Sequence, residues 1–340
     1  MVSKAFSYLP AIFTLLLVHV SSFPSGYNNN GGYNIDNNGL TYRFYDISCP
    51  NLQMTVRSGV WKAFRDDSRV AASLLRLHFH DCFVNGCDGS ILLDETEEFK
   101  GEKNAFPNRN SVRGYEVIDA IKAQVEKSCP LTVSCADLVA LAAREAVVLT
   151  GGPFWPVPLG RRDSTTADEQ AANTNLPSPL EPLENITAKF VSMGLDFKDV
   201  VVLSGAHTIG FAQCFVFKNR LFNFRGSGQP DPNLAVSVLT KLQDTCPNVD
   251  SSNSKLAPLD VASSVKFDNA YYVNLMKKTG LLESDQILMN DPKSAALVKS
   301  YSENPYLFMN DFAVSMVKMG SIGVLTGNDG IIRAKCGLVN

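Results

Sequence analysis

Apolar side chains recur at intervals of three and four residues through much of the chain, the spacing that lets an α-helix bury one face. Strict alternation of apolar and polar residues, the pattern of a half-buried strand, is sparse. The sequence therefore predicts a mainly α-helical fold. The predicted helices run over Leu52–Phe64, Ser68–Asp81, Tyr115–Lys127, Thr132–Leu149, Leu183–Met193, Phe197–Leu203, Asn269–Lys278 and Met309–Met319.

Several predicted helices have recognisable ends. Thr132 or Ser134 can cap the helix that starts near Cys135, and the Gly-Gly-Pro run at 151–153 should stop it. Helix C-termini are also predicted at 192–194 and 279–280. Segments rich in Pro, Gly, Asn and Ser predict loops at 153–180, 223–233 and 247–266.

The first residues have the features of a secretory signal. Lys4 supplies a positive charge, an apolar run follows at 11–20, and Ser21 and Ser22 are small residues suited to cleavage. A membrane anchor is the alternative, but a spanning helix needs about 20 apolar residues and this run is shorter. We predict a signal peptide over 1–22, a flexible Asn/Gly-rich segment over 23–40 and one folded domain over 41–340.

Composition narrows the class of protein. The 340 residues are 45% hydrophobic and 19% charged, with a formal net charge of -3, as in an ordinary globular protein. This nearly neutral balance gives no reason to expect nucleic acid or an anionic membrane as partner.

The eight cysteines fit an oxidising compartment. They stand at 49, 82, 87, 129, 135, 214, 246 and 336, an even number that predicts four disulfides. Spacing alone leaves about 105 connectivities. Buried free thiols or a zinc site are the alternatives, although no Cys-x-x-Cys pair occurs. A sequon at Asn185 offers a glycosylation site.

Histidine chemistry rests on three residues of the mature chain, because His19 lies in the predicted signal. On a helix, Arg76, Phe79 and His80 share one face, while His78 points elsewhere. The imidazole can move a proton near neutral pH, and the guanidinium can stabilise a developing anion without losing its charge. The alternative is a helix whose polar side chains only satisfy local hydrogen bonds.

The loop after His80 is rich in oxygen donors. Asp81, Asp88 and Ser90 offer side-chain oxygens, and its glycines allow carbonyl groups to turn inward, as a Ca²⁺ site requires. The spacing is not that of an EF-hand. On composition alone, a polar turn closed by a disulfide is the favoured alternative.

His207 lies among small residues in the segment LSGAHTIG. An isolated histidine in apolar surroundings is more often a core residue than a ligand, but small neighbours leave room for a bulky, flat group near the backbone. Downstream, Asp285 could hold the second ring nitrogen, as carboxylates do for metal-bound histidines.

These segments together resemble the class III haem peroxidases, the secretory peroxidases of plants. The resemblance covers roughly Tyr42 to Asn340 and rests on the ordered motifs FYDISCP, RLHFHDCFVNGCDGSILLD, EKNAFPNRNSVRGYEVID, VSCADLVALAAREAV, GGPFWPVPLGRRD, NLP, LSGAHTIG, FDNAYY and ESDQ. It implies an all-α fold in which two helical lobes sandwich one haem b, with four disulfides.

The resemblance also implies the central roles. His207 would be the axial ligand of the haem iron, with Asp285 accepting its other ring hydrogen. On the opposite side of the haem, His80 would take a proton from hydrogen peroxide and deliver it to the leaving oxygen, and Arg76 would stabilise the departing anion.

Supporting roles follow from the same motifs. Asn108, itself supported by Glu102, would hold His80 in its basic tautomer. Phe79 would wall off the haem edge, and the backbone carbonyl of Pro177 would help to bind aromatic substrates.

Two calcium sites and a disulfide pairing are implied as well. The first calcium site would use Asp81, Val84, Gly86, Asp88 and Ser90, and the second Thr208, Asp260, Ser263, the carbonyl of Lys266, and Asp268. Ser263 stands where threonine is usual in the family, which preserves the hydroxyl. The implied pairs are Cys49–Cys129, Cys82–Cys87, Cys135–Cys336 and Cys214–Cys246.

The function implied is that of a secreted peroxidase, a monomer that reduces hydrogen peroxide and oxidises small phenolic donors in one-electron steps. Only four residues follow Cys336, so we expect the extracellular space or cell wall rather than the vacuole. One alternative is a catalytically silent cell-wall interaction protein that keeps the fold. Another is a zinc hydrolase built on His78 and His80, whose side chains should however diverge on a helix.

Overall fold

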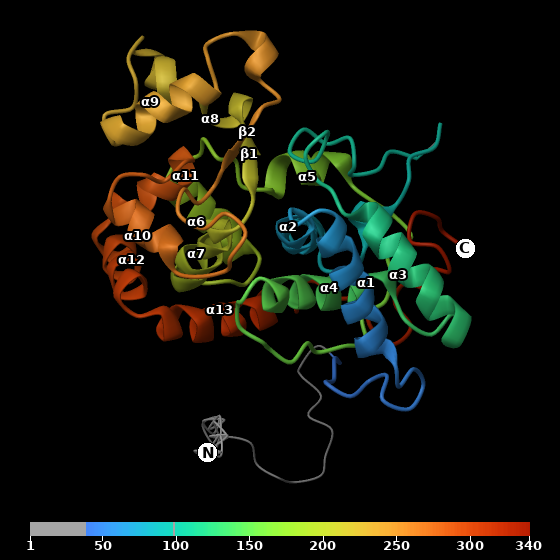
Figure 1. The fold of residues 1–340 in the computed structure, drawn as a ribbon. Helices are drawn as coiled ribbons and strands as arrows, with labels where there is room; N and C mark the ends of the chain where they lie inside the picture. The colour runs from blue at the N-terminus through green and yellow to red at the C-terminus, as the bar shows by residue number, and fades with distance from the viewer. Residues whose placement is uncertain (1–38, 98) are drawn as a thin grey trace, which may run out of the picture. The chain divides into compact units, whose positions relative to one another are not determined.

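The structure, a computed structural model, describes residues 39–97 and 99–340. The predicted signal peptide over 1–22, His19 and nearly all of the predicted segment 23–40 lie outside these residues. The described chain forms thirteen α-helices, five short 3-10 helices and one antiparallel sheet of two strands (Figure 1).

The elements have the following bounds. The α-helices are α1 (Leu52–Asp66), α2 (Val70–Cys82), α3 (Tyr115–Ser128), α4 (Cys135–Leu149), α5 (Glu169–Asn175), α6 (Leu183–Ser192), α7 (Phe197–Ser204), α8 (Cys214–Phe222), α9 (Val236–Thr245), α10 (Ala270–Met276), α11 (Glu283–Gln286), α12 (Pro292–Glu303) and α13 (Pro305–Met319). The 3-10 helices are η1 (Ser90–Leu92), η2 (Gly205–Thr208), η3 (Phe224–Gly226), η4 (Asp250–Ser252) and η5 (Ile287–Met289). Strand β1 (Phe211–Gln213) pairs with β2 (Leu256–Pro258).

The prediction of a mainly α-helical fold is confirmed, and a helix lies in every segment where one was predicted. Ser134, not Thr132, caps α4, since its Oγ accepts a hydrogen bond from the Asp137 backbone at 3.1 Å. The predicted loop over 153–180 is wrong where α5 lies. Helix α10 ends at Met276, before the predicted 279–280, because Lys278 takes the left-handed conformation at φ 58°.

Helix α4 lies at the centre of the main core. All its residues from Cys135 to Val147 are buried, as expected for a helix that is apolar on nearly every side. It packs against α1, α2 and α3 (Figure 1). Its buried polar residues have partners: Glu145 pairs with Arg144 at 2.8 Å and with Arg57 at 2.9 Å. Helix α2 therefore packs on a helix that is buried and whose charged residues are paired.

A second group of helices surrounds α7. Helix α7 packs against α6, α12 and α13 and runs directly into η2. Its start is fixed by a capping box, in which Asp196 and Asp199 each accept a hydrogen bond from the other's backbone N–H. A smaller apolar cluster forms beside this group from residues of α8, α9 and β2, including Phe217, Leu242 and Ala257.

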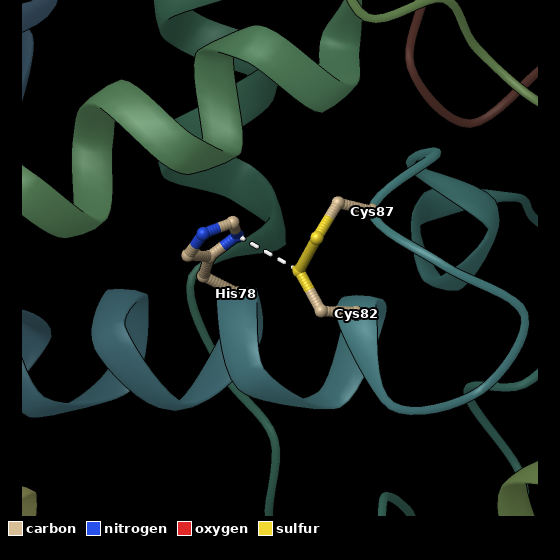
Figure 2. A group of neighbouring side chains, drawn as sticks. All are labelled: His78, Cys82 and Cys87. Carbon is tan, nitrogen blue, oxygen red and sulfur yellow. Dashed lines mark hydrogen bonds between the residues drawn. A yellow bond between two sulfur atoms is a disulfide. The ribbon is translucent and has the colours of Figure 1, made fainter. Parts of the chain in front are cut away.

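The four disulfides are the same pairs that the family resemblance implied. They join Cys49–Cys129, Cys82–Cys87, Cys135–Cys336 and Cys214–Cys246. Cys82 and Cys87 close the loop that follows α2, and His78 lies beside their bond with Nδ1 3.5 Å from the Cys82 sulfur (Figure 2).

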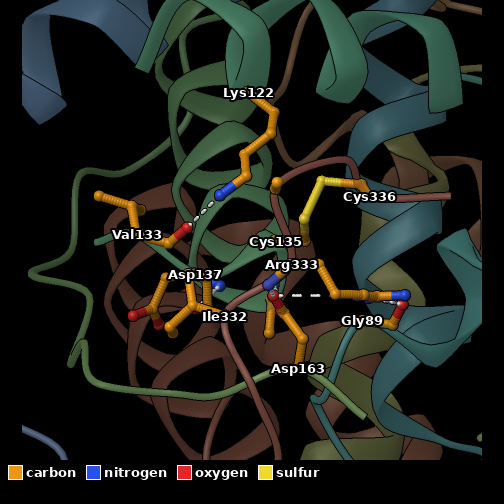
Figure 3. The surroundings of a disulfide bond; sticks show 12 residues. Gly89, Lys122, Val133, Cys135, Asp137, Asp163, Ile332, Arg333 and Cys336 are labelled. Atoms are coloured by element: carbon orange, nitrogen blue, oxygen red, sulfur yellow. Dashed lines mark hydrogen bonds and ion pairs between the residues drawn. A yellow bond between two sulfur atoms is a disulfide. The ribbon is translucent and has the colours of Figure 1, made fainter. Parts of the chain in front are cut away.

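The Cys135–Cys336 bond ties the start of α4 to the C-terminal segment (Figure 3). Beside it, the fully buried Arg333 donates to the carbonyl of Gly89 and faces the carboxylate of Asp163 at 3.8 Å. Asp163 in turn accepts hydrogen bonds from the backbone of Ala136 and Arg333, both at 2.9 Å. This network fixes the loop at Gly89 against α4.

None of the helices in the described part of the chain is long and apolar enough to cross a membrane.

Candidate active site

Helix α2 presents Arg76, Phe79 and His80 on one face, as their spacing predicted. Nε of Arg76 donates a hydrogen bond to Nε2 of His80 at 3.0 Å. Since a guanidinium can only donate, Nε2 of His80 carries a lone pair and no hydrogen.

The other ring nitrogen of His80 is held by Asn108. Nδ1 of His80 lies 2.6 Å from Oδ1 of Asn108, and Nδ2 of Asn108 donates to the backbone carbonyl of Glu102 at 2.8 Å. Because a carbonyl can only accept, the Asn108 amide must direct its Nδ2 to Glu102 and its Oδ1 to the His80 ring. Nδ1 of His80 must therefore be the donor. Glu102 thus supports Asn108 through its backbone rather than its carboxylate. The two contacts select one tautomer from both sides of the ring.

The surroundings of His80 favour the neutral ring. Burial is the largest cause that lowers the pKa of His80 well below its ordinary value, and the positive charge of Arg76 lowers it further. The hydrogen bond that His80 donates to Asn108 acts in the opposite direction but is the weaker effect. His80 is therefore neutral at neutral pH, with its lone pair on Nε2.

Arg76 is fixed by the loop after Glu102. One terminal nitrogen donates to the carbonyl of Pro107 at 2.9 Å and to the hydroxyl of Ser111 at 3.2 Å. Nothing in the sequence pattern pointed to Ser111. The Arg76 side chain is exposed, yet the desolvation of its guanidinium lowers its pKa to about 10.

His207 projects from η2, directly after α7. Nδ1 of His207 lies 2.7 Å from Oδ1 of Asp285, which α11 carries, so the predicted pairing is present. Asp285 is almost completely buried, whereas the His207 side chain is 38% exposed. With Nδ1 held by the carboxylate, Nε2 is the nitrogen that remains for a metal.

A further donor reaches the same carboxylate. The hydroxyl of Tyr271 on α10 lies 3.1 Å from Oδ1 of Asp285, and the backbone N–H of Leu282 lies 3.2 Å from Oδ2. The motif FDNAYY contains Tyr271, but no role had been assigned to it.

The segment after His207 lies against α2. A Cβ atom placed on Gly210 would come within 2.9 Å of Cβ of Ala72, which precedes Arg76 by one helical turn. From the same side of α2, Phe79 lies near Phe190 of α6, with ring centroids 6.3 Å apart. The His80 and His207 segments therefore flank one region of the molecule.

The donor set of this region fits a haem. An accessible imidazole backed by a buried carboxylate lies on one element, and an imidazole with a guanidinium lies on the helix beside it. Histidine with a carboxylate partner is a standard axial ligand of haem iron.

The sequence suggested that the small residues near His207 leave room for a flat group. The structure shows that this is not true of all of them. A Cβ atom on Gly205 would meet the hydroxyl of Tyr272 and the ring of Phe308 within 3 Å. The absence of a side chain at Gly205 thus allows close packing of η2 on α10 and α13. That part of the interpretation is wrong because protein atoms fill the space.

Buried oxygen atoms without hydrogen-bond partners occur at the end of α2 and in the segments that follow it. They are Oδ1 of Asp81, Oγ of Ser90 and Oε2 of Glu102. Burial, followed by the charges of Asp88 and Glu102, raises the pKa of Asp81 well above its usual range. Burying such oxygens is costly unless a partner compensates for lost water. A hard cation, which prefers oxygen ligands, fits such oxygens.

The other predicted ligands of the first calcium site lie in the same loop. The Asp88 carboxylate accepts from the Ser90 backbone at 3.0 Å. The carbonyl of Val84 accepts from Asn175 at 3.1 Å, and that of Gly86 accepts from the Asp88 backbone at 2.9 Å. Asn175 ends α5, so the predicted substrate residue Pro177 follows two residues later, close to this loop.

A second set of oxygens meets beside η2. Oγ1 of Thr208 lies 3.3 Å from Asp260 and 3.4 Å from Asp268, and Oγ of Ser263 lies 3.0 Å from Asp268. The ammonium group of Lys266 lies 3.5 Å from Asp268. The structure therefore brings the five residues of the second predicted calcium site together, one residue away from His207.

The zinc alternative does not fit the geometry. His78, Cys82 and Cys87 offer ligand-type atoms within 4.8 Å of one another, but both sulfurs belong to a disulfide and cannot act as thiolates (Figure 2). His80 is directed to Arg76 and Asn108 instead.

Comparisons with known proteins identify the family of this chain. The sequence model of the family described as Peroxidase matches residues 56–304. Peroxidase 10 of Arabidopsis thaliana is 81% identical over 300 residues, which are 88% of this chain and 86% of that protein. Peroxidase N of Armoracia rusticana is 53% identical over 305 residues, with 88% and 91% covered. Peroxidase P7 of Brassica rapa is 51% identical over 302 residues, with 88% and 100% covered.

Peroxidases of this family use a haem cofactor and act on hydrogen peroxide together with a reducing substrate. The all-α structure, the four disulfides and these matches therefore lead to one assignment, and the catalytically silent alternative is not favoured. The chain is a peroxidase and belongs to the plant class III haem peroxidase family.

Proposed function

We propose that this peroxidase holds haem b between His207 and the pair His80–Arg76, and that it oxidises small phenolic donors in one-electron steps. The observation that carries the proposal is the chain of contacts from Arg76 through His80 to Asn108, because it prepares one imidazole nitrogen as a base. When bound, the haem supplies the iron at which the oxygen–oxygen bond of peroxide is broken.

His80 acts as the proton carrier. Its Nε2 accepts a proton from hydrogen peroxide and then returns it to the oxygen atom that leaves as water. Asn108 keeps the hydrogen of the ring on Nδ1 throughout, so that Nε2 alone exchanges protons with the substrate.

Arg76 stabilises the negative charge that develops on the leaving oxygen. Its contacts to Pro107 and Ser111 fix the guanidinium before the reaction, so little reorganisation is needed when charge appears. Because arginine keeps its proton, it does not compete with His80 for the proton of the substrate.

His207 would hold the iron through Nε2, and Asp285 would make the imidazole a stronger electron donor by accepting its hydrogen. Phe79 would lie against the bound haem, and the carbonyl of Pro177 would accept a hydrogen bond from the phenolic donor. A phenol needs only to approach closely enough to lose one electron, so the site admits more than one donor.

Two Ca²⁺ ions complete the proposed enzyme. The first is bound by Asp81, Val84, Gly86, Asp88 and Ser90, and the second by Thr208, Asp260, Ser263, Lys266 and Asp268. Support comes from the unpartnered oxygens of Asp81 and Ser90 and from the convergence of carboxylates and hydroxyls beside η2.

The protein is proposed to be a secreted monomer of the extracellular space or cell wall, with the mature domain over 41–340. Its four disulfides suit an oxidising compartment. Asn185 lies exposed in α6, where a glycan can be accommodated.

Stopped-flow measurement of the reaction with hydrogen peroxide tests the role of His80. His80→Leu should slow this reaction by about 10²–10⁴, the usual contribution of a general acid–base residue, while haem stays bound. His78→Leu is the matched control, because His78 belongs to the same helix but contacts neither Arg76 nor Asn108. A haem-loaded His80→Leu that reacts at the wild-type rate would refute the proton-carrier role.

A further inference from the structure

The hydrogen-bond arrangement of Asp285 has a feature that the proposed function does not use. Two donors share its Oδ1 atom: Nδ1 of His207 at 2.7 Å and the hydroxyl of Tyr271 at 3.1 Å. A carboxylate can only accept, so the phenol must donate. The two rings also meet edge to face, with centroids 6.3 Å apart.

Tyr271 is not the sole anchor of the carboxylate. Oδ2 of Asp285 accepts a hydrogen bond from the backbone N–H of Leu282 at 3.2 Å, within the turn that starts α11. Tyr271 itself is 2% exposed, so its hydroxyl acts on Asp285 without competition from bulk water. The phenol thus adds a second hydrogen bond, shielded from solvent, to the oxygen that already accepts from His207.

We propose that Tyr271 is a positioning residue that weakens the hold of Asp285 on the His207 hydrogen and thereby limits how strongly His207 donates electrons to the iron. A hydrogen bond from the phenol draws negative charge toward itself. Oδ1 then attracts the imidazole hydrogen less, and the ring keeps more of its neutral character. A less electron-rich axial ligand stabilises ferric iron less relative to ferrous iron, which raises the reduction potential.

This inference rests on the proposed role of His207 as the iron ligand. If that role is wrong, the wild-type protein and all variants lack haem absorption. If only the present inference is wrong, all of them still bind haem, and Tyr271→Phe leaves the iron–histidine bond unchanged or shifts its properties in the opposite direction.

Tyr271→Phe removes the hydroxyl and keeps the ring. In the haem-loaded protein, the ferric/ferrous midpoint potential should shift to a more negative value. The iron–histidine stretching frequency of the ferrous form, measured by resonance Raman spectroscopy, should rise. Both changes report a stronger Asp285–His207 hydrogen bond, which a general loss of stability would not produce.

Tyr272→Phe is the matched control. Tyr272 is the adjacent residue on the same helix and is fully buried, but its hydroxyl donates to the carbonyls of Val201 and Val202 at 3.0 and 3.2 Å. Its loss should leave the potential and the stretching frequency at wild-type values.

A second substitution works in the opposite direction and does not depend on Tyr271→Phe folding well. Incorporation of 3-fluorotyrosine at position 271 makes the phenol a stronger donor, which should raise the midpoint potential and lower the stretching frequency. Unchanged values in both position-271 variants overturn the proposal. So does a more positive potential in Tyr271→Phe, because the tyrosine would then only anchor the carboxylate.

Discussion

Nε of Arg76 lies 3.0 Å from Nε2 of His80, four residues later on the same face of α2. This contact joins the two groups that hydrogen peroxide chemistry needs, a base and a fixed positive charge. It also means that the guanidinium depresses the pKa of the imidazole it contacts. The two residues therefore cannot be treated as independent, and predictions for one involve the other.

Replacement of Arg76 should slow the reaction with peroxide without removing the haem. Arg76→Leu eliminates the fixed charge beside the leaving oxygen, which is expected to cost about 10²–10³ in rate. Arg76→Lys should fall between this variant and the wild type, because it keeps a charge but loses the planar contact geometry. Stopped-flow kinetics provide the measurement. Arg113→Leu, at a surface pair with Asp67, is the control and should react normally.

The pH dependence of the same reaction follows from the lowered pKa of His80. The base is the neutral ring, and a lowered pKa keeps the ring neutral to more acidic pH. The rate constant should therefore stay level through neutral pH and fall only well below the ordinary histidine value of about 6.5. In Arg76→Leu, the loss of the repelling charge should move this acid limb to higher pH. An identical acid limb in both proteins would contradict the electrostatic account.

Calcium removal should destabilise the folded protein. The unpartnered buried oxygens of Asp81 and Ser90 would lose their compensating charge. An ion present at a hundredfold excess over its Kd contributes about 2.7 kcal/mol, so a chelator should lower the unfolding temperature measured by calorimetry. Asp81→Asn should reduce this sensitivity, whereas Asp119→Asn on the exposed side of α3 should not. If neither calcium nor a chelator changed the unfolding temperature of the wild-type protein, the two proposed sites would be contradicted.

A buried ion pair between α4 and the following loop should be essential for stability. Asp137 and Arg161 pair at 2.8 Å and are both fully buried, and Asp137 also accepts from the hydroxyl of Tyr45 at 2.9 Å. Asp137→Asn leaves the guanidinium without its counter-charge and should cost about 3–5 kcal/mol in the free energy of unfolding, measured with denaturant. Asp46→Asn, at the exposed pair with Arg43, should cost about 0–1 kcal/mol. Equal costs at the two sites would refute this ranking.

The sequence predicts helices best where apolar residues recur over several turns, as in α2 and α4. It fails at α5, a seven-residue helix of which only Ala172 is buried, because so short an element has little periodicity. Helix α12 was also missed. Asp291 caps it and Pro292 occupies its first turn, and these two residues are a local helix-start signal that an analysis of apolar spacing alone does not use.

In the candidate site, contacts within one helix were also easier to predict than contacts between distant segments. Helical spacing alone brings Arg76 and His80 together. The approach of Asn108 to His80 and of Asp285 to His207 depends on tertiary contacts across 28 and 78 residues, which helical spacing does not predict. Ser111 and Tyr271 follow from neither source, because their roles consist of single hydrogen bonds made after the fold has closed.

The central claim is that one haem lies between His207 and the pair His80–Arg76. The most direct measurement is titration of the purified, correctly oxidised protein with hemin, followed by absorption in the Soret region. The account predicts a Soret band that saturates at one hemin per chain and is strongly altered in His207→Ala. A protein that stays colourless at saturating hemin, or a His207→Ala variant with the wild-type spectrum, would contradict it.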